Sequence, residues 1–144
     1  MGAPLGRLDP DQASALVEAA GELRITPWRS VVIPHRAGSA ALTAVGLIAT
    51  PDSPWLGVTA CAGRPRCDKA LADVRADAAT AVAQDARGSS GQVHWAGCTR
   101  RCGRPAGRVV DVVATADGYE VSADGRTDRV TGLYDTIQVV RGRR

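Results

Sequence analysis

The sequence contains four cysteines, and their spacing could hold a metal centre. Five residues separate Cys61 from Cys67, three separate Cys98 from Cys102, and thirty residues lie between the two pairs. The thiols therefore arrive as two close pairs on separate loops. Four thiolates complete the ligand set of one tetrahedral zinc ion or of one cubane iron-sulfur cluster.

Three interpretations of these pairs compete. Structural zinc usually has about two to four residues between paired ligands, and the spacing of the first pair is loose for it. Disulfides suit a short secreted protein, but the start of the chain lacks the basic and apolar segments of a signal peptide. An iron-sulfur cluster tolerates uneven spacing because its ligands sit at the corners of a larger object than one ion. The spacing favours the cluster, and zinc and disulfides stay as alternatives.

The sequence around both pairs resembles a known family. The motifs are A-C-A-G-R-P-R-C-D-K-A-L-A-D-V-R and H-W-A-G-C-T-R-R-C-G, and a third segment, L-R-I-T-P-W-R-S-V-V, runs from Leu23 to Val32. Together they resemble the nitrite/sulfite reductase haemoprotein superfamily, and within it most closely the precorrin-3B synthase family of the cobalamin pathway. The resemblance extends over nearly the whole chain. It implies an α+β fold, with a ferredoxin-like half-domain followed by a nitrite/sulfite-reductase-type cluster-binding α+β domain.

The resemblance also implies a cofactor and an activity. A [4Fe-4S] cluster would be held by Cys61, Cys67, Cys98 and Cys102. In members with sirohaem the last cysteine, here Cys102, also bridges to the tetrapyrrole iron. The implied activity is that of an iron-sulfur oxidoreductase that oxidises precorrin-3A. The alternative is a non-catalytic or truncated [4Fe-4S] module, or the electron-transfer half of a sulfite or nitrite reductase-like protein.

Two features depart from the superfamily pattern. Reductases typically have G-C-P-N-x-C at the second pair, whereas this chain has G-C-T-R-R-C from Gly97 to Cys102. Family members normally repeat the half-domain and catalytic domain twice, and this chain carries about half of that arrangement. A lone half-domain leaves a sheet edge and an apolar face in water. We therefore expect a homodimer, or a second chain that supplies the missing half-domain.

Arginines gather on or beside the cysteine loops. They are Arg64, Arg66, Arg100, Arg101, Arg104 and Arg108. Guanidinium groups favour thiolate formation and offer bidentate contacts to carboxylates, so the first five are candidate contacts for a tetrapyrrole substrate or cofactor, sirohaem or another. The alternative is a solvated basic surface. No basic recognition helix or aromatic platform accompanies these arginines, so we predict no nucleic-acid partner.

Composition limits the class of protein. With 144 residues, 44% of them hydrophobic, and a net charge of +3, the chain can form one domain or two small ones, and a disordered or fibrous class is excluded. No segment is apolar enough to span a membrane, so we predict a cytoplasmic protein without a membrane partner. No nucleophile-base-acid constellation is visible, so any catalysis must come from the metal centre.

The predicted domains are residues 1–50, the ferredoxin-like half-domain, and residues 55–144, an iron-sulfur domain that could also bind sirohaem. Residues 51–54 form the linker, because two prolines within four residues break regular structure. In the first domain, Asp9 as N-cap and Gln12 three residues later predict a capping box. Leu16 and Val17 would lie on the buried face of that helix.

Other elements follow from periodicity and turn residues. The predicted segments are an extended Leu23–Ile33 bent at Pro27, a helix Ser39–Ile48, a strand Trp55–Thr59, a helix Asp68–Arg87 with Leu71 on its buried face, a strand Gln92–Trp95, a hairpin of Val109–Thr115 and Tyr119–Ser122, short strands Arg126–Val130 and Thr136–Val140, and a frayed tail Arg141–Arg144.

Two histidines complete the candidate chemistry. Alternation places His94 on one strand face with Ala96, where it could lie near a bound tetrapyrrole or act as a structural hydrogen-bonding side chain. The second interpretation is favoured. His35 follows Pro34 in a polar loop, and we assign it no role.

Overall fold

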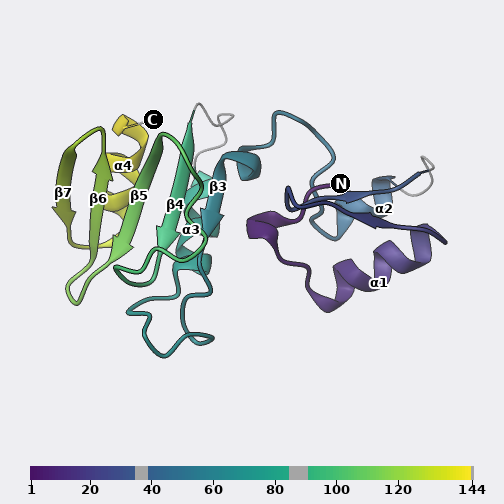
Figure 1. Ribbon diagram of the computed structural model, residues 1–144, viewed down its shortest axis with the longest axis horizontal. Helices are drawn as coiled ribbons and strands as arrows, with labels where there is room; N and C mark the ends of the chain where they lie inside the picture. The colour runs from purple at the N-terminus through teal and green to yellow at the C-terminus, as the bar shows by residue number, and fades with distance from the viewer. Residues whose placement is uncertain (35–38, 85–90, 144) are drawn as a thin grey trace. The chain divides into compact units, whose positions relative to one another are not determined.

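The computed structural model describes residues 1–34, 39–84 and 91–143, and it divides into two compact units, Met1–Leu56 and Gly57–Arg144. Each unit combines helices with a β-sheet of its own (Figure 1), so the fold class is α+β as predicted. The described part of the chain contains no helix with the length and apolar character that crossing a bilayer requires.

The first unit begins with a short 3-10 turn, Pro4–Gly6, followed by helix α1, Pro10–Ala19. The predicted capping box is confirmed at the start of α1. The Gln12 backbone N–H donates to Asp9 Oδ1 at 2.8 Å, and the Asp9 N–H donates to Gln12 Oε1 at 3.1 Å. These two bonds satisfy backbone donors that the first helical turn leaves without partners.

The predicted extended segment from Leu23 to Ile33 is a hairpin instead. Its strands are β1, Arg24–Ile25, and β2, Val31–Val32, and they pair antiparallel. Pro27 lies in the turn between them. The hydroxyls of Thr26 and Ser30 are 2.7 Å apart across that turn. The bend that proline predicted is therefore a full reversal of the chain.

Helix α2, Ser39–Ala44, is shorter than predicted. Gly46 has a φ of +83°, which ends the helix, and Ile48 leaves it to form a β-bridge with Gly2. The burial of α1 was also predicted wrongly in part, because Leu16 is buried whereas Val17 is 71% exposed. The core of this unit is small: its cluster of buried side chains is Leu16, Val31, Leu42 and Leu47, and Ile48 is also buried.

The second unit is built on a five-stranded sheet in the order β3-β4-β5-β6-β7. The strands are β3, Val58–Ala60; β4, Gln92–Ala96; β5, Val109–Ala114; β6, Tyr119–Ala123; and β7, Arg126–Val130. Strands β3, β4 and β5 are parallel, and β5, β6 and β7 are antiparallel. The predicted β4, the hairpin and β7 are confirmed. The first part of the predicted strand from Trp55 is a 3-10 turn, Pro54–Gly57.

Two helices cover one face of this sheet, α3, Val74–Gln84, and α4, Leu133–Arg143, and Figure 1 shows α4 behind the strands. The Tyr119 hydroxyl donates to Asp77 of α3, and its ring packs edge-on against Trp95 with centroids 5.4 Å apart. The two helices also meet directly, since Arg141 Nη2 donates to the Gln84 carbonyl at 2.5 Å.

Helix α3 starts six residues later than predicted, at Val74 instead of Asp68. The reason is tertiary. The N–H of Leu71 donates to the Gly97 carbonyl at 2.8 Å, and the Ala72 carbonyl accepts from the Arg64 N–H at 3.0 Å. Both groups are therefore bonded to the cysteine loops instead of to a helix, and Leu71 is exposed. The predicted end of this helix, from residue 85 to 87, lies outside the described residues.

The segment Thr136–Val140 is helical, although its β-branched residues predicted a strand. Thr136, Ile137 and Val140 are buried at helical spacing. Gly132 precedes the helix, and its carbonyl accepts from the Thr136 hydroxyl at 2.7 Å. The tail predicted as frayed is part of α4 up to Arg143.

Candidate metal centre at the ends of two parallel strands

Both cysteine loops start at the same edge of the sheet. Cys61 follows β3 directly, and Cys98 comes two residues after β4. These strands are parallel neighbours with Val58 opposite Val93 in register, so their carboxyl ends meet at one edge. The topology thus brings together two pairs of thiols that lie far apart in the sequence.

Gly97 joins the two loops through its backbone. Its N–H donates to Cys61 Sγ at 3.1 Å, and its carbonyl accepts the Leu71 N–H. A Cβ atom added at Gly97 would lie 2.6 Å from the Ala70 Cβ, closer than real contacts allow. Glycine is therefore required for this approach. An N–H aimed at this sulfur could also donate to it if the sulfur were a metal ligand.

The first loop is held by its own turn. The Cys67 N–H donates to the Gly63 carbonyl at 2.9 Å, and Gly63 has a φ of +64°. The Arg64 side chain closes the loop from outside, because its Nε donates to the Ala70 carbonyl at 2.7 Å. Arg64 is thus engaged with the protein backbone of the loop that carries the first cysteine pair.

All four cysteines are free thiols; Cys61, Cys67 and Cys98 are half-buried and Cys102 is exposed. Within residues 1–34, 39–84 and 91–143, no three His, Cys, Asp or Glu side chains gather closely enough to hold one metal ion. The donor type, the shared edge and the N–H···S bond fit an iron-sulfur cluster. A closed ligand set would require the loops to draw the thiols closer than they are here.

The predicted tetrapyrrole-contacting arginines fall into different environments. Arg66 and Arg100 are exposed on the two loops. Arg104 is bound to the protein itself, with Nε donating to both carboxylate oxygens of Asp111, each at 2.9 Å. Arg101 Nε lies 4.0 Å from the same carboxylate.

Asp111 is the residue that the sequence reasoning missed. It stands alone among valines in β5, in Val-Val-Asp-Val-Val, and its side chain is 12% exposed. A carboxylate inside an apolar strand needs a buried partner. This isolated aspartate in a run of valines is the sequence signal that could have identified Asp111.

Asp111 belongs to a row of polar residues that crosses the whole sheet. Strand register places Thr59, His94, Asp111, Ser122 and Thr127 side by side. The row lies on the face opposite the helices, because Trp95 of the same strand packs toward α3 through Tyr119 and neighbouring residues alternate between faces.

His94 is fully buried in this row and has a structural hydrogen bond, as favoured from the sequence. Its Nδ1 lies 2.7 Å from Thr59 Oγ1. Burial lowers the pKa of His94 below the ordinary histidine value; Asp111 opposes this shift, and Arg104 adds to it. The Cys102 backbone also acts to raise this pKa. His94 Nε2 has no hydrogen-bond partner among the described residues. His35 lies outside the described residues.

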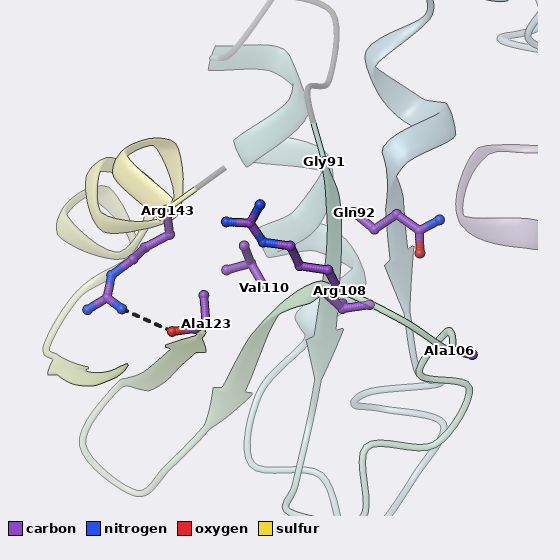
Figure 2. Close-up of a pocket in the computed structure, with 8 residues that line it drawn as sticks. Gly91, Gln92, Ala106, Arg108, Val110, Ala123 and Arg143 are labelled. Atoms are coloured by element: carbon purple, nitrogen blue, oxygen red, sulfur yellow. Dashed lines mark hydrogen bonds between the residues drawn. The ribbon is translucent and has the colours of Figure 1, made fainter. Parts of the chain in front are cut away.

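A hollow lies at the other end of the sheet, beside the first residues of β5 (Figure 2). It is a cavity of about 510 Å³ with Val110 and Ala123 at its base and the side chains of Arg108 and Arg143 along it. Arg108 is therefore remote from the cysteine edge. Both arginines already have acidic partners, since Arg108 Nη2 donates to Asp124 at 2.5 Å and Arg143 donates to Asp128. Their charges are balanced within the protein.

Part of the chain matches a known family. A model of the nitrite/sulfite reductase ferredoxin-like half domain matches residues 1–43, and no curated protein matches the chain. The match supports the predicted superfamily through the first unit and fits a general oxidoreductase class. The matched residues end before the cysteine loops, so the cysteine site depends on its own geometry.

Proposed function

We propose that the chain is an iron-sulfur oxidoreductase of the nitrite/sulfite reductase type, with a [4Fe-4S] cluster held by Cys61, Cys67, Cys98 and Cys102. The observation that carries the proposal is the placement of both cysteine loops at the carboxyl ends of β3 and β4, joined by the Gly97 N–H bond to Cys61 Sγ. A bound cluster would supply one-electron transfer. The protein's own contribution would be four cysteine ligands and, at Cys61, the N–H donor of Gly97.

Within that class, we propose a precorrin-3B synthase-like activity on a tetrapyrrole. The support is the resemblance of both cysteine motifs to that family and the Thr99-Arg100-Arg101 sequence where reductases have Pro-Asn. Arg66 and Arg100 are the exposed guanidinium groups nearest in sequence to the ligands, and they suit carboxylates of a tetrapyrrole. Arg104 is bonded to Asp111, and Arg101 lies 4.0 Å from the same carboxylate, so their contribution to such a ligand would be indirect.

A second candidate is an iron-sulfur module without catalysis of its own. What favours it is the single half-domain, whose described sheet has only the two short strands β1 and β2. A module of this kind would bind the cluster and exchange electrons but would bind no tetrapyrrole.

The test is anaerobic purification with iron and acid-labile sulfide analysis. We expect about four of each per chain, and a brown protein. Cys61→Ser, Cys67→Ser, Cys98→Ser and Cys102→Ser should each lose most of the iron, because a cubane needs four protein ligands. Thr99→Ala is the control, since Thr99 is exposed within the same loop. Stoichiometric zinc in a colourless anaerobic sample would overturn the proposal.

Absorption scans with sirohaem and with a corrinoid precursor separate the two candidates. The oxidoreductase should bind a tetrapyrrole and shift its absorption bands, and Arg66→Ala with Arg100→Ala should weaken that binding. A protein that holds the cluster and leaves both tetrapyrrole spectra unchanged would be the module.

A further inference from the structure

The second cysteine pair lies on a long connection without helix or strand, running from residue 97 to 108 between β4 and β5. Two successive turns shape its first half: the Arg101 N–H donates to the Cys98 carbonyl at 3.2 Å, and the Arg104 N–H donates to the Arg101 carbonyl at 3.1 Å. Arg101 itself has a φ of 49°, a left-handed conformation that a non-glycine residue adopts at a cost. Something outside these turns must hold the connection in this conformation.

Asp111 provides that attachment. Its carboxylate receives Arg104 Nε on both oxygens at 2.9 Å and has Arg101 Nε at 4.0 Å. Arg101 and Arg104 flank Cys102 in the sequence, so two guanidinium groups from either side of one cysteine converge on one carboxylate. We call Asp111, Arg101 and Arg104 the Asp111 clamp.

The clamp is attached to a fully buried strand of the second unit. Asp111 lies in β5, where all six residues are buried, and it is paired with His94 on one side and Ser122 on the other. His94 is itself bonded to Thr59 in β3. Asp111 has a side chain only 12% exposed, unlike Asp124, whose pair with Arg108 is in solvent. Exposed ion pairs contribute little, whereas breaking a buried pair leaves an uncompensated charge.

We propose that Asp111 is the positioning residue for the second cysteine pair, acting through Arg104 and Arg101 to hold Cys98 and Cys102 over the sheet edge where Cys61 also lies. This inference rests on the proposed function, because that function gives the two thiols a cluster to bind. The positions of the two thiols can nevertheless be tested without a cluster. Loss of the clamp should release the connection that carries Cys98 and Cys102 from β5.

The test uses Asp111→Asn, which keeps the shape of the side chain and removes its charge. Asp124→Asn is the matched control, because it breaks an Asp-Arg pair of the same kind in solvent and away from the cysteines. In the anaerobic full-length protein with reconstituted cluster, iron release to a chelator should be at least tenfold faster in Asp111→Asn and unchanged in Asp124→Asn. The same iron-release rate in Asp111→Asn and wild type would overturn the proposal.

A metal-free measurement keeps this inference separate from the proposed function. Phenylarsine oxide bonds to two neighbouring thiols and releases one water. In a Cys61→Ser, Cys67→Ser background, the rate of that adduct at Cys98 and Cys102, followed by mass spectrometry, should fall about tenfold with Asp111→Asn. If wild type takes up no cluster but the arsenical rate falls, the proposed function fails and the clamp stands. An unchanged arsenical rate overturns the clamp.

Arg104→Lys covers the case in which Asp111→Asn does not fold. It retains the positive charge on the loop, outside the sheet, and removes the Nε donor that both Asp111 oxygens share. Circular dichroism should show the wild-type sheet and helix content in this variant. A folded Arg104→Lys protein with wild-type iron release and arsenical rates would also overturn the proposal.

Discussion

The two units differ in how completely each buries its own apolar residues. The second unit has a five-stranded sheet, and its largest fully buried side chain is Trp95. In the described part of the first unit the sheet has two strands of two residues each and the core cluster has four buried side chains, while Ile25 is 85% exposed and Trp28 79% exposed. The second unit can be stabilised by its own sheet, whereas the first leaves large apolar groups in water.

The two units would therefore bind different kinds of partner. The second unit has a five-stranded sheet with a buried core and two cysteine loops that start at one edge, so a metal centre would add to a fold that already exists. The first unit has a capped helix and a hairpin but little core, so a protein surface would complete it. We therefore propose that the first unit binds a second copy of the chain or a partner chain with the other half-domain.

The largest expected effect is on stability, and it compares two tryptophans. Trp95→Ala should destabilise the protein by about 3 to 5 kcal/mol because it removes a fully buried ring from the sheet core. Trp28→Ala should change the free energy of unfolding by less than about 0.5 kcal/mol in dilute solution. Urea unfolding followed by circular dichroism measures both. Equal losses would contradict the difference between the units.

The next effect is on association. The paired substitutions Ile25→Ser and Trp28→Ser should weaken a homodimer at least about tenfold, since large apolar anchors dominate interface energies. Sedimentation velocity should show wild type at about twice 14.9 kDa and the double variant at the mass of one chain. Tyr134→Ser, at an exposed position of the second unit, is the control. A dimer that survives the double substitution would refute this surface.

The smallest effect is a pH dependence in the second unit. Burial, followed by the hydrogen bond to Asp77, raises the pKa of Tyr119. Because the unfolded chain ionises near the ordinary tyrosine pKa of about 10, stability should be full below that pH and fall as the pH rises above it. Tyr119→Phe should cost about 1 kcal/mol at neutral pH and flatten this alkaline decline. Tyr134→Phe should keep the alkaline decline in stability. If the decline disappears in that control, Tyr119 is not its source.

Local sequence rules predicted the elements whose signals are local. The capping box of Asp9 and Gln12, and the hairpin at Asp117-Gly118, depend on residues within a few positions, and both are confirmed. The start of α3 was predicted six residues too early, and the hairpin of β1 and β2 was predicted as one extended segment. Leu71 is drawn away from the helix by the Gly97 carbonyl, a partner that periodicity cannot reveal.

The candidate site was predicted in part. The spacing of the cysteines identified two loops, and the parallel pairing of β3 and β4 shows why they share an edge. The role of Asp111 depends on its contact with Arg104, which the folded structure shows and the sequence does not. From the sequence, Arg104 was therefore assigned to an external ligand. For Thr136–Val140, β-branched residues predicted a strand, but burial of Ile137 and Val140 against the sheet stabilises a helix.

The approach of Gly97 to Ala70 constrains which amino acids the two positions can hold together. A methyl group fits at one of the two positions but not at both, because the added Cβ would be 2.6 Å from the other one. In a library of variants, substitutions at residue 97 should therefore be tolerated only together with Ala70→Gly. The nearest atoms to the new Cβ would then be the Cα of residue 70 at 3.3 Å and the Gly63 Cα at 3.6 Å. The two cysteine loops would then vary as one unit, although twenty-six residues separate these two positions in the chain.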